Sequence, residues 1–488
     1  MIRGLIHRRF CSHKLKPPRI WPHIERPSLT QALSSAMKNP SGGFYLLNGG
    51  KGSGKSDALY RVATKGKQSP QSMSNIAIIV DFERVDHCRE SEDLVAWIVQ
   101  QISRQLSLQL DSSRIMMLCL ENCPDFGERF NSFISKKPLW NHLTKSCKSV
   151  EEAWHRVMTS QPTVAEVLPQ LRLATLPQDE LGLYIELLKS AKMPVSMCLL
   201  HTERVGSSSG SLGPLMNPSF NVIVECNDPL MSIWTVCGGD SNREWNVIEV
   251  NDLPLEAVNA VFVPSLLSDS IQANTLYEIC GGRVGLLEKL FVPLTTLREQ
   301  QKLRDMDQEQ RYRAGKENRP SSESKELQVD PLVYQRDVVL RDSLVEGVLN
   351  EQTHSFSNAM DTLLNQTAAL SSYRVSLSPI EYRVFVMESL KQLADKIQSQ
   401  GSIPLPATLS PMDIAHPVIL GMMECGLLMV RWVPFTRIVI ANPSTLVQIE
   451  AWCNSQLEDL SIPDRVAYNV IAKRNRIHLD RQLDKLGA

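Results

Sequence analysis

The chain has 488 residues, 43% of them hydrophobic and 22% charged, and its formal net charge is −1. A chain of this length can form two or three domains, and its balanced charge excludes a whole-molecule attraction to nucleic acid or anionic lipid. Its eleven cysteines form no Cys-x-x-Cys pair and no Cys/His cluster at zinc spacing. This arrangement favours reduced thiols in a non-secreted protein over a disulfide or zinc framework.

The N-terminal residues are basic, and no acidic residue precedes Glu25. On a helical wheel the apolar side chains gather on one side, and these are Ile2, Leu5, Ile6 and Phe10. Arg8-Arg9-Phe10 resembles the cleavage site of a matrix protease. These features are typical of a mitochondrial transit peptide, to which we assign residues 1–26, and they predict a mitochondrial, matrix location. The alternative is a basic N-terminus without a targeting role. The sequence has no run of about 18 apolar residues, so we expect no membrane span.

Residues 49–56 fit the phosphate-binding loop pattern G-x-x-x-x-G-K-[ST] at every fixed position. The apolar residues 44–47 before them suit a buried strand, and residues 57–63 after them suit the first turns of a helix. In such a loop the glycines let backbone N–H groups point at the phosphates. Lys55 would reach the β and γ phosphates of a nucleotide, and the Ser56 hydroxyl would coordinate Mg²⁺. The predicted nucleotide-binding residues are Gly49, Gly50, Lys51, Gly52, Ser53, Gly54, Lys55 and Ser56. The alternative is a glycine-rich turn that matches by chance.

Four further apolar runs predict strands, and helical stretches separate several of them. The runs are residues 76–81, 195–200, 220–226 and 245–250. Strands alternating with helices predict an α/β fold with a parallel central sheet that is covered on both faces. Residues 90–108 show helical spacing, and residues 111–176 show weaker helical signals.

The C-terminal third begins after a polar, charged stretch at residues 300–330. Ser378-Pro379-Ile380-Glu381 opens a helix that should stop near Gly401. Residues 427–432 and 437–440 alternate like a hairpin, and a helix should follow at residues 443–456. Helices, a hairpin and a helix resemble a winged-helix module. We therefore divide the chain into a transit peptide, a P-loop domain, a charged linker and a helical, winged-helix-like domain, with bounds 1–26, 27–299, 300–339 and 340–488.

Hydrolysis needs an acidic residue near Mg²⁺ and a residue that positions water. Two strand ends are candidates for this role: one carries Asp81 and Glu83, and the other carries Thr202 and Glu203. Some folds of this kind have extra strands inserted in the central sheet. In them the acidic pair ends a later strand of the chain, and that strand lies directly beside the strand that precedes the loop. Glu203 is therefore the predicted water-polarising residue. Thr202 stands where an aspartate would be ideal, so it could hold a metal-bound water but brings no charge. The alternatives are a solvated strand end for Asp81 and Glu83, and a surface glutamate for Glu203.

Two further residues are candidates for sensing the γ-phosphate. Asn227 follows the strand at residues 220–226 and could position the attacking water, or it could form a turn before Asp228-Pro229. Arg283 could neutralise charge in the transition state, or it could make surface contacts at a helix start.

Taken together, the chain resembles an AAA+/STAND-type P-loop ATPase of the archaeal-ATPase and origin-recognition-like branch. The resemblance rests on residues 49–56, the strand ending at Glu203, Asn227, and Gly281-Gly282-Arg283 with Leu286-Leu287. The last element resembles the GG-x-P-x-x-L element of that branch's small helical lid. The resemblance implies ATP and Mg²⁺ as cofactors, with ATP hydrolysis coupled to conformational switching. This chain departs from it in lacking an Asp-Glu pair after residues 195–200, and in the early position of Arg283.

A second resemblance is to the nucleotide-binding protein of the small mitochondrial ribosomal subunit, the death-associated protein 3 class. In that class nucleotide has a mainly structural part, and the Asp-Gly-x-Asn segment of that class is missing here. A third reading is DNA binding through the winged helix. Because acids offset the basic residues between 376 and 456, direct nucleic-acid binding is not expected. We expect ATP or GTP as ligand and a protein partner for the C-terminal module, and oligomerisation is compatible with the resemblance.

Overall fold

The computed structural model describes most of the chain between residues 26 and 473. The described residues are 26–65, 75–87, 91–160, 164–191, 193–205, 213–237, 244–258, 260, 277, 280–290, 306, 331–405, 416–432, 436–441, 444–458 and 460–473. Residues 1–25 of the predicted transit peptide and most of the predicted linker lie outside them. Two compact units share the chain. The larger comprises Arg26–Asn251, Leu363–Ala441 and Ser455–Ala488, and the smaller includes Asp252–Thr362 and Asn442–Asn454.

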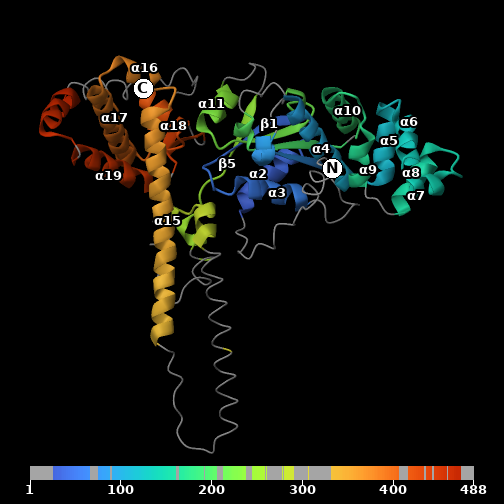
Figure 1. The fold of residues 1–488 in the computed structure, drawn as a ribbon, viewed down its shortest axis with the longest axis horizontal. Helices are drawn as coiled ribbons and strands as arrows, with labels where there is room; N and C mark the ends of the chain where they lie inside the picture. The colour runs from blue at the N-terminus through green and yellow to red at the C-terminus, as the bar shows by residue number, and fades with distance from the viewer. Residues whose placement is uncertain are drawn as a thin grey trace, which may run out of the picture. The chain divides into compact units, whose positions relative to one another are not determined.

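The larger unit is built on a five-stranded, all-parallel sheet, which confirms the predicted α/β class (Figure 1). Its strands are β1 (Gly43–Asn48), β2 (Ile76–Asp81), β3 (Val195–Leu200), β4 (Asn221–Glu225) and β5 (Trp245–Glu249). The order across the sheet is β2-β3-β4-β1-β5. The expectation that residues 195–200 lie directly beside the loop strand is wrong. Phe44 of β1 pairs with Val222 of β4, and β4 separates β1 from β3.

Both faces of the sheet are buried, which explains the continuous apolar runs of its strands. Successive residues alternate between two cores because side chains on a strand point to opposite faces. Leu46 lies in the core formed with helix α4 (Ser91–Gln109) and its neighbours. Leu47 lies in the opposite core, with α2 (Pro27–Met37) and α3 (Lys55–Lys65). The sheet is therefore a rigid platform whose strand ends carry the polar residues.

Strand β2 is an edge of the sheet, and side chains of α4 satisfy its backbone. The Gln109 amide donates to the Ala77 carbonyl over 2.6 Å and accepts from the Ala77 N–H over 2.9 Å. Gln105 bonds to both backbone groups of Ile79 in the same way. Because an open edge leaves unpaired N–H and C=O groups, these amides fix β2, and with it Asp81 at its end.

A helical insertion joins β2 to β3, as the weak helical signals predict. Its helices are α4, α5 (Ser112–Asn122), α6 (Phe126–Ser135), α7 (Pro138–Thr144), α8 (Val150–Ser160), α9 (Val164–Leu171) and α10 (Pro177–Ser190). In Figure 1, α5–α8 form a layer beyond α9 and α10. Its centre is aromatic, because Phe126, Phe130 and Trp154 are all fully buried and in ring contact.

The C-terminal part of the larger unit contains a second, antiparallel sheet in the order β6-β8-β7. Its strands are β6 (Ile403–Pro404), β7 (Leu428–Arg431) and β8 (Arg437–Ile440), and its helices are α16 (Ser371–Ser376), α17 (Pro379–Gln400) and α18 (Pro417–Glu424). The hairpin prediction is confirmed. The helix prediction at Ser378 is also confirmed, because a capping box with Glu381 opens α17 and Gly401, at φ +74°, closes it.

Two further helices precede and follow this part in the sequence. Helix α15 (Pro331–Asn365) begins inside the span 300–339 that we assigned to the linker, and α19 (Ser444–Glu458) follows the hairpin. Among the described residues, none of the helices has the length and apolar character needed to cross a membrane.

Candidate phosphate-binding site

The connection from β1 to α3 curls at two glycines. Gly52 has φ +80° and Gly54 has φ +88°, a left-handed conformation that glycine adopts without steric cost. The Ser53 N–H donates to the Gly50 carbonyl over 3.1 Å, and α3 begins at Lys55. The glycine spacing therefore shapes a tight loop that ends at a helix N-terminus, which is the geometry that favours an anion.

Gly49 is required by its close packing rather than by its φ angle. A Cβ atom at this position would lie 2.6 Å from the carbonyl oxygen of Val250, the residue that follows β5. The Val250 N–H in turn donates to the Asn48 carbonyl over 2.7 Å. Any side chain at Gly49 would push the loop away from β5.

The Lys55 side chain lies inside the curl of the loop. Its ammonium donates to the Gly49 carbonyl over 2.5 Å and to the Gly50 carbonyl over 3.1 Å. Lys55 is only 2% exposed. A buried cation at a helix N-terminus provides positive charge where phosphate groups would bind.

Ser56 contacts an acid that the sequence analysis did not select. Its hydroxyl donates to the Glu225 carboxylate over 2.9 Å, and Glu225 ends β4. Burial raises the pKa of Glu225, and the nearby charges of Lys55 and His201 oppose that shift. The signal that could have revealed Glu225 is an acid that ends an apolar strand, the same pattern that singled out Asp81.

Thr202 is buried at the end of β3, and its hydroxyl donates to the Glu225 backbone carbonyl over 3.0 Å. This bond ties the ends of β3 and β4 together. Glu203, the next residue, accepts from the Asn227 side-chain amide over 2.8 Å and from its backbone N–H over 3.4 Å. The structure thus brings the predicted residues Glu203 and Asn227 into direct contact.

His201 lies between two acids, at a left-handed φ of +55°. Its Nε2 is 3.9 Å from Asp81 Oδ1, and its Nδ1 is 3.7 Å from Glu203 Oε1. The Glu203 hydrogen bond is the main cause that raises the pKa of His201, and burial opposes it. Burial disfavours ionised Glu203, but hydrogen bonds from His201 and Asn227 overcome it and hold the Glu203 pKa at about 2. When His201 is protonated, it forms an ion pair with Glu203.

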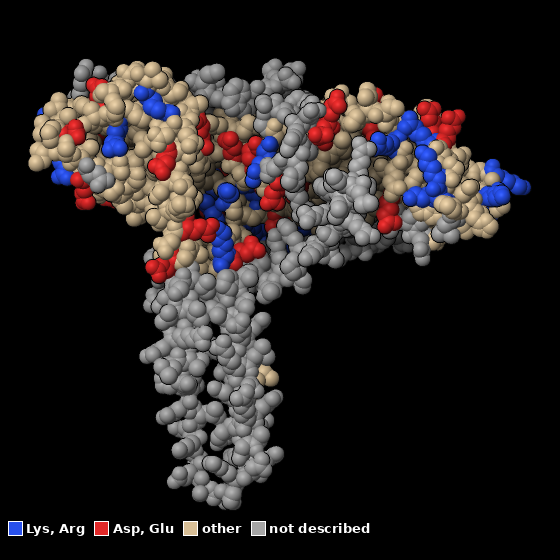
Figure 2. Space-filling view, viewed as in Figure 1, with Lys and Arg blue, Asp and Glu red and all other residues tan. Residues whose placement is uncertain are grey.

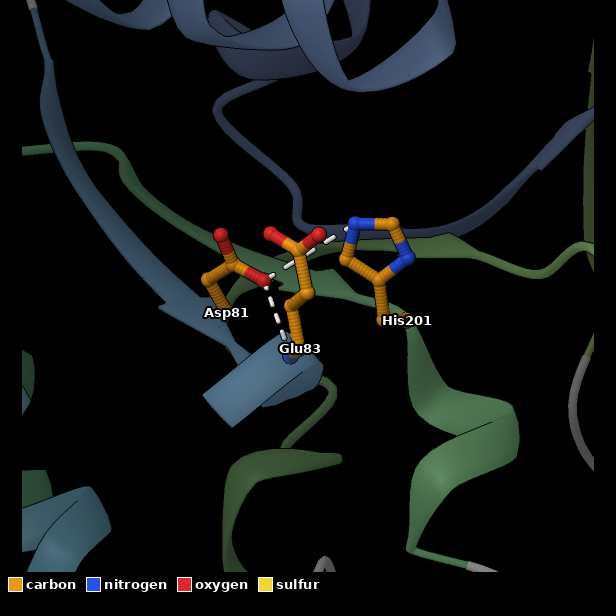
Figure 3. A group of neighbouring side chains, drawn as sticks. All are labelled: Asp81, Glu83 and His201. Carbon is orange, nitrogen blue, oxygen red and sulfur yellow. Dashed lines mark hydrogen bonds and ion pairs between the residues drawn. The ribbon is translucent and has the colours of Figure 1, made fainter. Parts of the chain in front are cut away.

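Two sets of side chains could hold a cation in the described part of the chain. Ser56 and Glu225 offer a hydroxyl and a carboxylate, the oxygen ligands that Mg²⁺ prefers. Asp81, Glu83 and His201 offer ligand atoms within 4.8 Å of one another (Figure 3). In the second set a proton on His201 would compete with a metal, because its neighbouring carboxylates raise its pKa.

The sequence matches no protein-family model and no curated protein.

Arg283, the remaining candidate, belongs to the smaller unit. Its guanidinium donates to both carboxylate oxygens of Asp252, over 3.0 Å and 3.3 Å. Arg283 is 8% exposed and precedes a helical segment at residues 284–290. In this structure the arginine is thus paired with a carboxylate of its own unit.

The His201–Glu203 pair predicts a pH dependence of stability. Because folding raises the pKa of His201, this group stabilises the folded state fully below its unfolded-state pKa of about 6.5. That stabilisation is lost as the pH rises through the folded-state pKa. Because folding lowers the pKa of Glu203, this group stabilises the folded state above pH 4.5, its ordinary pKa, and the stabilisation is lost as the pH falls towards 2. The pair should therefore stabilise most between these limits. In thermal unfolding scans, His201→Asn should flatten the decline above about pH 6.5. Parallel curves for the variant and the wild type would contradict the assignment.

Proposed function

We propose that this chain is a P-loop ATPase that binds ATP with Mg²⁺ and couples hydrolysis to conformational switching. One observation carries the proposal: the loop between β1 and α3 buries the Lys55 ammonium and brings Ser56 against a carboxylate at the start of a helix. The resemblance to AAA+/STAND-type ATPases supports the same reading, with GTP as the alternative nucleotide.

The roles of the residues follow from their chemistry. Lys55 and the loop N–H groups would bind the β and γ phosphates, and Ser56 would coordinate Mg²⁺. Glu203 is a carboxylate and would polarise the attacking water, while Asn227 would orient it. The Thr202 hydroxyl already donates to the Glu225 carbonyl, so we assign it a positioning role at the metal site. Arg283 would sense the γ-phosphate only after leaving Asp252.

Contacts between β7 and the edges of the loop support coupling to the C-terminal module. The Asn48 side chain, directly before the loop, donates to the Val430 carbonyl over 2.8 Å. Arg431 donates to the Val250 carbonyl over 3.3 Å and lies 3.9 Å from Glu249. A shift of the loop on nucleotide binding would therefore reach β7 directly. We propose that this module is a winged helix and that the P-loop domain carries a small helical lid, to which Gly281-Gly282-Arg283 belongs.

The partner of the C-terminal module is, in this proposal, a protein rather than a nucleic acid. On the face drawn in Figure 2, acidic and basic side chains of the described residues are interspersed. Nucleic-acid binding needs clustered lysine and arginine to release counterions. The basic, acid-free N-terminus supports a mitochondrial, matrix location.

A second candidate is a structural nucleotide-binding subunit with little turnover, as in the death-associated protein 3 class. The binding of Glu203 by His201 and Asn227 favours it, because a carboxylate with a pKa of about 2 is a weak base. Faster turnover would require Glu203 to leave these partners.

Measuring ATP turnover of the wild type and of Glu203→Gln separates the two candidates. If Glu203 acts on water, the substitution should lower turnover about 100-fold while ATP stays bound, because general-base groups contribute about 10²–10⁴. Equal turnover in both proteins, near background and with nucleotide retained through purification, would contradict the ATPase proposal and favour the structural role. Co-sedimentation of tagged protein with mitochondrial ribosomes would then test the second candidate.

A further inference from the structure

We propose that Glu225, from the end of β4, supplies the carboxylate of the Mg²⁺ site beside Ser56. The residues at the end of β3 were expected to supply it. The inference rests on the proposed nucleotide binding and extends it by naming the residue that makes binding depend on the metal.

Among the described residues, one oxygen of the Glu225 carboxylate has a hydrogen-bond partner and the other has none. Oε1 accepts from the Ser56 hydroxyl over 2.9 Å. Oε2 is buried and accepts no hydrogen bond from the described residues. Glu225 as a whole is 1% exposed. Buried polar atoms almost always have a partner, so an unpartnered carboxylate oxygen beside a serine of the loop fits a site for a cation or its water.

The order of the strands explains why the acid comes from β4. Because β4 lies between β3 and β1, its end is next to the strand that carries the loop. The three residues after β3 are engaged elsewhere. His201 faces Asp81, Thr202 donates to the Glu225 carbonyl, and Glu203 binds Asn227. The Thr202 bond also fixes the backbone from which the Glu225 side chain extends.

The position of Glu225 gives it opposite effects with and without the metal. Alone, a carboxylate beside Lys55 offsets the lysine charge and repels a triphosphate. With Mg²⁺ bound, the same carboxylate attracts the cation that the phosphates also bind. Glu225 should therefore weaken binding of metal-free ATP and strengthen binding of Mg²⁺–ATP. A purely structural role would change both affinities alike.

The test compares the affinity of a fluorescent ATP analogue with Mg²⁺ and with EDTA, for the full chain and for Glu225→Gln. Glutamine keeps the size of the side chain and an oxygen that can accept from Ser56. The variant should bind the metal-free analogue at least as tightly as the wild type. The Mg²⁺ enhancement, which is the ratio of the affinity with Mg²⁺ to the affinity with EDTA, should fall about 10- to 100-fold. This is the range for loss of a group that supports a metal site. Electron paramagnetic resonance of Mn²⁺ bound with ATP should show weaker metal binding in parallel.

Glu180→Gln is a matched control, because Glu180 is also buried and burial also raises its pKa. Glu180 lies in α10 and not at the loop, so the Glu180→Gln variant should show the same Mg²⁺ enhancement as the wild type. Glu225→Asp, which keeps the charge but shortens the side chain, should keep part of the enhancement. An unchanged enhancement in Glu225→Gln would overturn the inference and leave nucleotide binding intact. A wild type that binds no nucleotide would instead overturn the proposed function.

Discussion

Replacing Lys55 with alanine should weaken Mg²⁺–ATP binding by about 100-fold or more. Lys55 is buried in the loop, where its ammonium already bonds to two carbonyls. Losing one partner of a buried, hydrogen-bonded charge pair costs about 2–5 kcal/mol, and each 1.4 kcal/mol is about tenfold in affinity. Isothermal titration calorimetry measures the change. Circular dichroism of the variant should match that of the wild type, because both printed hydrogen bonds of the ammonium go to the loop.

Lys51, another of the predicted nucleotide-binding residues, provides a graded comparison for this prediction. It lies in the same loop and carries the same charge, but its side chain is exposed. Lys51→Ala should therefore lose less affinity than Lys55→Ala, since exposed charges are screened by solvent. Equal losses in the two variants would point to a general electrostatic effect, and equal retention would remove Lys55 from the binding site.

Replacing Trp154 with alanine should lower the free energy of unfolding more than any other substitution proposed for this protein. Trp154 is 1% exposed, and its ring centre lies 5.2 Å from that of Phe130 and 5.7 Å from that of Phe126. Removing a large buried aromatic side chain costs about 3–5 kcal/mol, because the cavity does not collapse. Urea unfolding followed by circular dichroism measures this free energy.

Two controls separate the cavity from the hydrogen bond that Trp154 makes. Its indole N–H donates to the Ser112 carbonyl over 2.8 Å. Trp154→Phe keeps most of the ring packing and should cost less, about 1–3 kcal/mol for the lost bond. Met117→Ala, at a side chain that is 49% exposed, should be near neutral. A small effect of Trp154→Ala would mean that the helical insertion is not packed as described.

The sequence predicted the local elements well because their signals are local. The apolar runs became β1–β5, the glycine spacing became the loop, and Ser378 with Glu381 became a capping box. The order of the strands could not be predicted in the same way. Pairing between β1 and β4 joins segments far apart in the chain, and no local pattern records which apolar run lies beside which.

The error in strand order also explains what was missed at the site. Placing residues 195–200 beside the loop directed attention to Thr202 and Glu203. The structure places β4 there instead, so the acid beside Ser56 is Glu225. The sequence did identify Asn227 and Glu203 separately, but their mutual hydrogen bond depends on how two strand ends meet. Likewise, the pairing of Arg283 with Asp252 depends on a fold that spacing alone does not show.

The most direct test of the central claim is the binding of Mg²⁺–ATP to the purified wild-type chain, measured by calorimetry. We predict that Mg²⁺–ATP binds saturably and that GTP or ADP competes with it. The Lys55→Ala substitution should abolish or strongly weaken this binding. Absence of binding to both ATP and GTP with Mg²⁺, even at millimolar nucleotide, would contradict the account.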